Sequence, residues 1–225
     1  MTPTAPARQG KGSATDPASK SEKYGSEQPL TARGRRTRSN LIQAAREVFE
    51  EAGFSGARVD GITSKAKTSY GSFYTYFDSK EEIFREVVKQ VTGEMFEASA
   101  VGDSVIGDSV ARIEAANRSY LKAYARNARI MSLIEEVAPY DSYSKVLLRA
   151  IRSLFVQRNE RGIRRMQEQG LADRRLDAPI AASALGGMVE LFARNSFLMG
   201  EPYEEDKAVE TLTRLWAGAL GLPTS

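Results

Sequence analysis

Residues 59–80 read V-D-G-I-T-S-K-A-K-T-S-Y-G-S-F-Y-T-Y-F-D-S-K. Val59 and Ile62 share one face of a short first helix, and Phe73 and Phe77 give a second short helix its buried stripe. The rest of the second helix is small or hydroxylated, whereas a purely structural helix would more often carry Glu, Lys or Gln. Two short helices with a tight break and an exposed, hydroxyl-rich second helix predict a helix-turn-helix that reads DNA.

The positive charge of the 225-residue chain is unevenly placed. Residues 33–80 hold about four more Lys and Arg than Asp and Glu, whereas residues 81–225 hold about two fewer. A basic segment on a mildly acidic body suits a polyanion that binds at one end only. A basic cluster just before the first predicted helix favours phosphate contact, in particular by Arg36, over a merely solvated terminus. It consists of Arg33, Arg35, Arg36 and Arg38.

The sequence contains no cysteine and no histidine. This excludes zinc sites built from thiolate and imidazole, disulfides, and mechanisms that need a Cys nucleophile or a His base. With no paired-acid or Gly-rich phosphate motif either, we predict no catalytic residue, no metal site and no cofactor. Because no apolar run approaches about 18 residues and none follows the first Met, we expect no membrane partner and a cytoplasmic location.

Composition and periodicity divide the chain into three parts. Residues 1–32 are rich in Pro, Gly, Ser, Thr and Lys and nearly lack large aliphatic residues, which predicts a disordered basic tail. Residues 33–80 form the predicted DNA-binding head. Residues 81–225 carry helical periodicity throughout and no alternating run long enough for a strand. The expected fold is all-α, with a three-helix head joined by a fourth helix to a helical body.

Capping signals set the expected helix boundaries. The first helix is predicted at 37–52, with Gly53 as a left-handed cap. Ser79 and Glu82 are spaced as a capping box that opens the fourth helix. In the body, Asn127 is expected to cap the start of a separate helix. Further helices are expected at about 142–169, 178–199 and 204–220.

The head resembles the TetR family of bacterial transcriptional regulators. The family's pattern is similar to V-x-x-I-A-x-x-A-G-V-S-x-G-T-L-Y-x-H/Y-F-x-S-K. The resemblance covers residues 33–95 and, more loosely, the helices from Ala184 to Leu220. It departs at Thr63 and at Lys67, where the family has a turn glycine, so Lys67 carries a side chain into that turn. The matching residues, in order, are Val59, Ile62, Ala66, Ser69, Gly71, Ser72, Phe73, Tyr74, Tyr76, Phe77, Ser79 and Lys80.

The resemblance implies how this segment contacts double-stranded DNA. The base-facing residues at the front of the recognition helix are Tyr70, Gly71 and Ser72. The phosphate-contacting residues are Thr37, Arg58, Ser69, Tyr74, Tyr76 and Lys80. This division is physically sensible, because a recognition helix enters the major groove with its N-terminal residues toward base edges while flanking groups hold phosphates.

The body is expected to dimerise and to hold a ligand. A small head makes too few contacts for tight binding alone, so we expect a homodimer that reads two half-sites. The predicted interface on the last two helices comprises Ala184, Gly187, Leu191, Leu212, Trp216 and Leu220. The predicted cavity wall comprises Tyr120, Tyr124, Met131, Ile134, Tyr140, Leu148, Ile151, Phe155, Met188 and Phe192. Such a wall suits a mostly apolar or aromatic effector.

These expectations describe a ligand-responsive repressor that binds a palindromic operator as a dimer and is nucleoid-associated when bound to DNA. One alternative is a helical DNA-binding dimer without a ligand. A second is a small helical enzyme that uses carboxylates such as Glu135 and Glu136, although adjacent side chains on a helix diverge by about 100°. A purely structural bundle is disfavoured by the basic head and the hydroxyl-rich helix.

Overall fold

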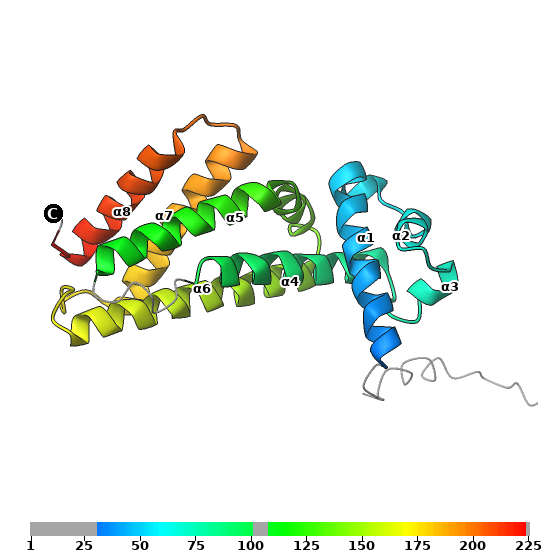
Figure 1. Cartoon of the computed structure of the whole chain (residues 1–225), viewed down its shortest axis with the longest axis horizontal. Coiled ribbons are helices and arrows are strands. Elements are labelled where there is room, and N and C mark those ends of the chain that lie inside the picture. Colours follow the sequence, from blue (N-terminus) through cyan, green and yellow to red (C-terminus); the bar gives the residue numbers. More distant parts are fainter. Residues whose placement is uncertain (1–30, 101–107, 224–225) are drawn as a thin grey trace, which may run out of the picture. The chain divides into compact units, whose positions relative to one another are not determined.

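The computed structural model describes residues 31–100 and 108–223. In these residues the chain forms eight helices and no strand, which confirms the all-α prediction (Figure 1). The helices are α1 (Ala32–Gly56), α2 (Val59–Lys65), α3 (Tyr70–Phe73), α4 (Lys80–Ala98), α5 (Ser109–Val137), α6 (Ser142–Glu168), α7 (Ala178–Leu198) and α8 (Glu205–Leu220). The predicted disordered tail lies, except for its last two residues, outside the described residues.

Helix α1 begins earlier than the predicted position 37. Thr31 caps it: its Oγ1 accepts a hydrogen bond from the Gly34 N–H at 3.1 Å, and its carbonyl accepts from the Arg35 N–H at 2.9 Å. The basic cluster at 33–38 therefore forms the first turns of α1 rather than the end of a tail. The predicted break at Gly53 is present, because Gly53 has a φ of 71° and helical backbone resumes beyond it to Gly56.

The α2–α3 segment is a helix-turn-helix with a short second helix. The turn contains Lys67 at a φ of 52°, the one non-glycine residue with a positive φ in the described part of the chain. Ser69 then caps α3, which ends at Phe73 and continues as a turn in which the Phe77 N–H donates to the Phe73 carbonyl at 3.0 Å. Phe73 and Phe77 are both buried, as their spacing predicts.

Helix α4 is anchored in the hydrophobic core of the head. The ring of Phe84 on α4 lies 5.0 Å from the rings of Phe49 and Phe54, edge-on to both. The predicted cap is present: Ser79 Oγ accepts from the Glu82 N–H at 3.2 Å, while Glu82 Oε2 accepts from the Asp78 N–H one residue before the cap. Because Phe84 belongs to the core of the head, α4 extends that core toward the body.

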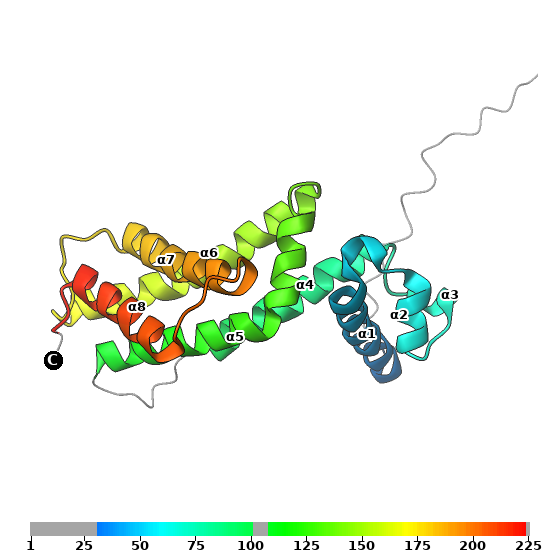
Figure 2. The ribbon, with the colours of Figure 1, turned by 90° about the horizontal axis from the view of Figure 1, so that it is seen from above.

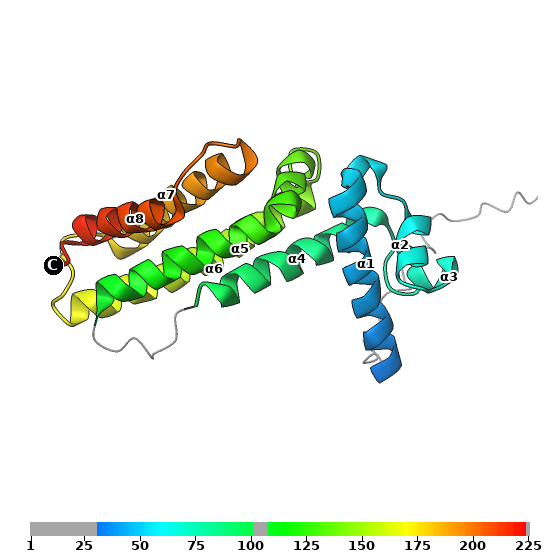
Figure 3. The same ribbon diagram turned by 45° about the horizontal axis from the view of Figure 1, so that its top comes forward.

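Helix α5 is the central helix of the body and packs against α4, α7 and α8, while α7 also packs along α6 (Figures 2 and 3). The prediction that Asn127 caps a separate helix is wrong. Helix α5 is continuous, and Asn127 lies buried within it, where its Nδ2 donates to the Ala123 carbonyl at 2.8 Å. Since only a short turn joins α5 to α6, the two helices run antiparallel (Figure 3).

Candidate functional site

Two tyrosines form the most exposed aromatic surface of the head. Tyr70 and Tyr74 on and just after α3 are 56% and 42% exposed. Their rings meet edge-on at 5.3 Å, and their hydroxyl oxygens lie 3.1 Å apart. The hydrogen bond to Tyr70 raises the pKa of the Tyr74 phenol, and a tyrosine hydroxyl can donate or accept a hydrogen bond.

The N-terminus of α3 presents two serines and a glycine. Ser69 Oγ accepts from the Ser72 N–H at 3.1 Å and lies 2.8 Å from Ser72 Oγ, which fixes both hydroxyls at the first turn. A Cβ on Gly71 would meet no other atom within 4 Å, and its φ is not positive. The glycine is therefore not needed for the fold of the single chain, and its effect is to keep the surface open.

Four other residues predicted to contact phosphates differ in their exposure and in their partners. Arg58 precedes α2, is exposed, and forms no side-chain cap, hydrogen bond or ion pair with any described residue. Arg36 is exposed on α1, and Thr37 is half-buried. Tyr76 packs partly against the hydrophobic core. The predicted DNA contacts of these four residues remain predictions.

Lys80 is engaged inside the head. Its Nζ donates to the carbonyls of Phe54 and Ala57 at 2.7 and 3.2 Å, and lies 4.5 Å from the centroid of the Phe54 ring. The ammonium thus holds the loop between α1 and α2 against the start of α4. Sequence reasoning assigned Lys80 to phosphate alone and missed this role, because its partners are backbone atoms more than twenty residues away.

The body encloses a cavity of ≈ 570 Å³ lined by α4, α5, α6, α7 and Trp216 of α8. Seven of the ten predicted wall residues line it: Tyr120, Tyr124, Met131, Ile134, Leu148, Ile151 and Phe155. The prediction is wrong for Tyr140, which is 92% exposed in the turn after α5. Met188 and Phe192 also do not line the cavity. Both side chains are partly buried and pack against the hydrophobic core.

The phenols of the cavity stay protonated. Burial, with Glu190 nearby, raises the pKa of Tyr120, and burial together with Glu135 and Glu190 raises that of Tyr124. Their rings lie 6.1 Å apart, and Tyr120 also meets Phe155 edge-on at 5.9 Å. The middle of the cavity is therefore lined by aromatic rings with neutral hydroxyls, beside Glu190 and Arg152.

The sequence indicated that Arg and Glu residues such as Glu135 could hold a polar end of the ligand, but sequence reasoning named none of the arginines of the cavity wall. Six arginines line it: Arg112, Arg149, Arg152, Arg158, Arg165 and Arg194. Arg158 lies three residues after Phe155, on the same inward stripe of α6, and this spacing was a usable signal. It donates to the Phe96 carbonyl at 2.6 Å and to Ser99 Oγ at 2.7 Å, and its burial lowers the pKa of the guanidinium.

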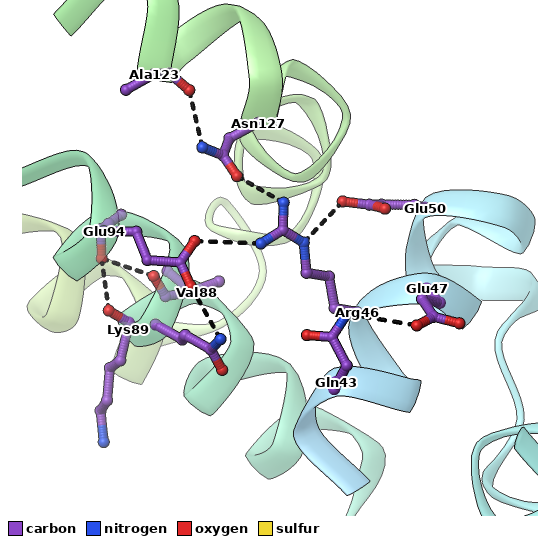
Figure 4. Close-up of polar contacts among 11 residues, drawn as sticks. Gln43, Arg46, Glu47, Glu50, Val88, Lys89, Glu94, Ala123 and Asn127 are labelled. Atoms are coloured by element: carbon purple, nitrogen blue, oxygen red, sulfur yellow. Dashed lines mark hydrogen bonds and ion pairs between the residues drawn. The ribbon is translucent and has the colours of Figure 1, made fainter. Parts of the chain in front are cut away.

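Arg46 of α1 links its helix to α4 and α5 (Figure 4). Its guanidinium contacts Glu50 on its own helix at 3.0 Å, Glu94 on α4 at 3.3 Å and Asn127 Oδ1 on α5 at 2.8 Å. Arg129 of α5 adds a bond from its Nε to the Glu50 carbonyl at 3.2 Å. The same stretch of α5 carries Tyr124 and Met131 of the cavity wall.

Burial within the single chain contradicts part of the predicted dimer interface on α7 and α8. Leu212, Trp216 and Leu220 are at most 7% exposed within the single chain, because the apolar stripe of α8 packs onto α5. Gly187 faces Arg152, 3.2 Å from where a Cβ would stand. Ala184 and Leu191 are exposed. The large apolar side chains that α7 and α8 expose are Ile180, Leu191 and Leu215, at 70%, 53% and 50%.

The carboxylates considered for an enzyme do not form a paired site. Glu135 Oε1 accepts from Arg194 Nε at 2.5 Å, and both Glu135 and Glu136 are exposed. Within residues 31–100 and 108–223, no group of three or more His, Cys, Asp or Glu side chains could hold a metal ion. Over the same ranges, no helix is both long and apolar enough to cross a bilayer.

Comparison with known proteins identifies relatives of the head and of the whole fold. Residues 41–87 match the family described as bacterial regulatory proteins, tetR family. The repressor NicS of Pseudomonas putida is 38% identical over 65 residues, which span 29% of this chain and 31% of NicS. The uncharacterised regulator YdgC of Bacillus subtilis is 23% identical over 191 residues, 85% of this chain and 96% of YdgC.

The fold of the whole chain is also similar to solved structures. A crystal structure assigned to a TetR-family transcriptional regulator from Mesorhizobium loti superposes with a TM-score of 0.72 at 18% identity. The match covers 84% of this chain and 98% of that protein. The chain spans about a third of the length of NicS, whereas similarity of fold covers 84% of this chain.

Proposed function

We propose that the chain is a regulator of the TetR family, whose model matches residues 41–87. In this proposal it is a cytoplasmic repressor that binds a palindromic operator as a dimer and is released by a small molecule. The observation that carries the proposal is the surface of α3, where exposed hydroxyls stand on a short helix fixed by a buried aromatic core. No hydroxyl of Tyr70, Ser72 or Tyr74 is needed to build that core.

In this proposal, some residues of the head contact bases and others contact phosphates. Tyr70, Gly71 and Ser72 occupy the first turn of α3, which is the part of a recognition helix that meets base edges. Arg58, whose charge has no partner among the described residues, flanks the helix and contacts a phosphate. Tyr74 and Ser69 contribute hydroxyls at the same surface.

Two copies associate through the exposed faces of α7 and α8. Ile180, Leu191 and Leu215 present large apolar side chains there, beside the smaller Ala184 and Ala219. Apolar side chains of this size rarely stay exposed together without a partner. A dimer gives the two-fold symmetry that a palindromic operator requires.

Effector binding is transmitted along α5. Tyr120, Tyr124 and Met131 line the cavity, and Asn127 and Arg129 between or beside them hold α1 through Arg46 and the Glu50 carbonyl (Figure 4). A ligand that shifts α5 changes these bonds and with them the preferred position of the head. The ligand lowers operator affinity by its preference for the shifted state.

Selection of bound duplexes from a random pool tests the proposal. We expect enrichment of a palindrome, with half-sites spaced by about one or more turns of roughly 10 base pairs. Tyr70→Ala should broaden the enriched sequences, whereas Glu136→Ala, an exposed change in the body, should not. Enrichment of no sequence, or of an asymmetric site bound by one copy, would contradict DNA reading by a dimer.

A further inference from the structure

We propose that the cavity of the body takes an amphipathic anion: an unbranched apolar chain with a carboxylate head group, bound with the head group beside Arg112, Arg158 and Arg165. This inference rests on the proposed function, because it names the class of the effector. The proposed ligand adds an anionic head group to the mostly apolar or aromatic effector that the sequence predicted.

The first observation is the separation of charge along the cavity. Since α5 and α6 run antiparallel, Arg112 near the start of α5 and Arg165 near the end of α6 lie at one end. The two acidic residues of the wall lie farther along the cavity, Glu190 near Tyr120 and Tyr124 and Glu135 beyond them on α5. Glu135 binds Arg194, and Glu190 lies 3.9 Å from Arg152. Both carboxylates of the wall are therefore near arginines, whereas the lining of the end at Arg112 and Arg165 has arginines and no carboxylate among the described residues.

The second observation concerns the end of the cavity at Arg112 and Arg165, where several side-chain N–H groups have no hydrogen-bond partner among the described residues. Arg112 and Arg165 form no side-chain hydrogen bond or ion pair with any part of the chain that the structure describes. Arg158 donates to the Phe96 carbonyl and to Ser99 Oγ, and it forms no ion pair with a described carboxylate, although Glu97 is near enough to act on its charge. Trp216, which is 7% exposed and also lines the cavity, has the one buried side-chain N–H without a partner among the described residues.

The buried N–H of Trp216 costs free energy unless an acceptor is supplied, whereas Arg112 is half-buried and Arg165 is exposed, so these two guanidinium groups contribute positive charge and accessible donors. The acceptor that satisfies several guanidinium groups together is a carboxylate or a similar oxyanion, because its two oxygens match the guanidinium fork. Trp216 can add a donor to a polar atom of the same ligand. The donors of this end therefore specify an anionic head group.

The third observation is the shape and the lining of the remaining cavity. From Arg112 to Glu135 the lining extends over about six turns of α5, or roughly 35 Å of helix. A volume of ≈ 570 Å³ spread over that length is narrow. The wall between the ends is mostly apolar or aromatic, including Tyr120, Phe155 and Ile163. A narrow apolar channel fits an extended chain better than a broad ring system.

The single tryptophan of the chain gives a direct readout, since Trp216 lines the cavity. Full-length protein is titrated with dodecanoate, dodecanol and dodecyltrimethylammonium below their micelle concentrations, with Trp fluorescence as the signal. We expect dodecanoate to bind at least tenfold more tightly than dodecanol, and the cation to bind most weakly. Dodecyl phosphate distinguishes a carboxylate site from a general oxyanion site, and equal or tighter binding of the phosphate would overturn the carboxylate assignment.

Matched variants locate the head group. The double variant R112Q/R165Q should weaken dodecanoate binding at least tenfold and leave dodecanol binding unchanged. R149Q, the same change at the other end of the cavity, should affect neither ligand. Equal binding of dodecanoate and dodecanol, an equal loss in R149Q, or no binding of any chain would overturn the proposal.

Operator binding is measured separately, so the two proposals fail in different ways. If the selected duplex is bound but no anion enters the cavity, the ligand class is wrong and the DNA-binding function stands. Binding of dodecanoate that lowers operator affinity supports both. Binding that leaves operator affinity unchanged supports the ligand class and overturns its role as effector.

Discussion

Lys67 is a strained residue at the centre of the helix-turn-helix. Its φ of 52° is in the left-handed region, which costs a residue with a Cβ about 1 kcal/mol relative to glycine. Lys67→Gly should therefore raise the free energy of unfolding by roughly 0.5–1 kcal/mol, measured by urea unfolding. Lys67→Ala keeps the Cβ and removes the charge, so it should give no such gain. Equal stabilisation by both variants would show that charge, not backbone strain, is responsible.

Lys80 and Arg58 carry the same charge and should respond differently to truncation. Lys80→Ala removes two hydrogen bonds to carbonyls and a cation–π contact, so we expect a loss of about 1–3 kcal/mol in unfolding free energy. Arg58→Ala removes no intramolecular bond that the structure describes, and stability should stay within about 0.5 kcal/mol.

DNA binding should separate the same two residues. Operator affinity of Arg58→Ala, measured over a series of salt concentrations, should fall with a salt dependence reduced by about one unit of slope. An unchanged slope would remove Arg58 from the phosphate contacts. Lys80→Ala is a poor probe of phosphate contact, because any loss of affinity includes the loss of its bonds to Phe54 and Ala57.

At the scale of the helices, local signals predicted best where both partners are close in sequence. The Phe73–Phe77 spacing and the Ser79 cap lie within a turn or so of their partners, and both are present. Asn127 was misread because an Asn side chain can cap a helix or bond back to the carbonyl four residues earlier. Its deciding partner is Arg46, 81 residues away, which no local window contains.

The cavity shows the same limit. Seven residues that periodicity predicted line the cavity, since inward apolar positions repeat along α5 and α6. Periodicity did not predict that Arg112 or Arg165 lines the cavity, because a charged residue on a helix is usually exposed to solvent. It also assigned Trp216 to a dimer surface, since the sequence alone does not say whether an apolar stripe packs onto its own chain or onto a second copy.

The contact of Arg46 with Asn127 couples two helices from different parts of the chain. In a double-mutant cycle of Arg46→Ala and Asn127→Ala, the effects on unfolding free energy should differ from additivity by about 1 kcal/mol. Asn117→Ala is the control, because Asn117 is also buried on α5 but bonds Thr213. Its combination with Arg46→Ala should be additive within about 0.5 kcal/mol. Equal coupling in both cycles would contradict a specific link through Asn127.

The dimer is a property of the whole molecule, and burial separates residues that hold the single chain together from those that can meet a second copy. Trp216 is buried in the body, so Trp216→Ala should lower the free energy of unfolding by about 3–5 kcal/mol, measured by urea unfolding. Leu191 is 53% exposed on α7, where Leu191→Glu should leave the fold of the single chain intact.

Leu191→Glu should nevertheless convert dimer to monomer in analytical ultracentrifugation, because it places a charge opposite its own copy across a two-fold interface. A single head then contacts one half-site, and affinity for the palindrome should fall at least tenfold. Leu154→Glu is the matched control, since Leu154 is 51% exposed on α6, outside the α7–α8 face. It should remain dimeric and bind the operator normally. A dimeric Leu191→Glu variant, or a monomeric Leu154→Glu variant, would move the interface away from α7 and α8.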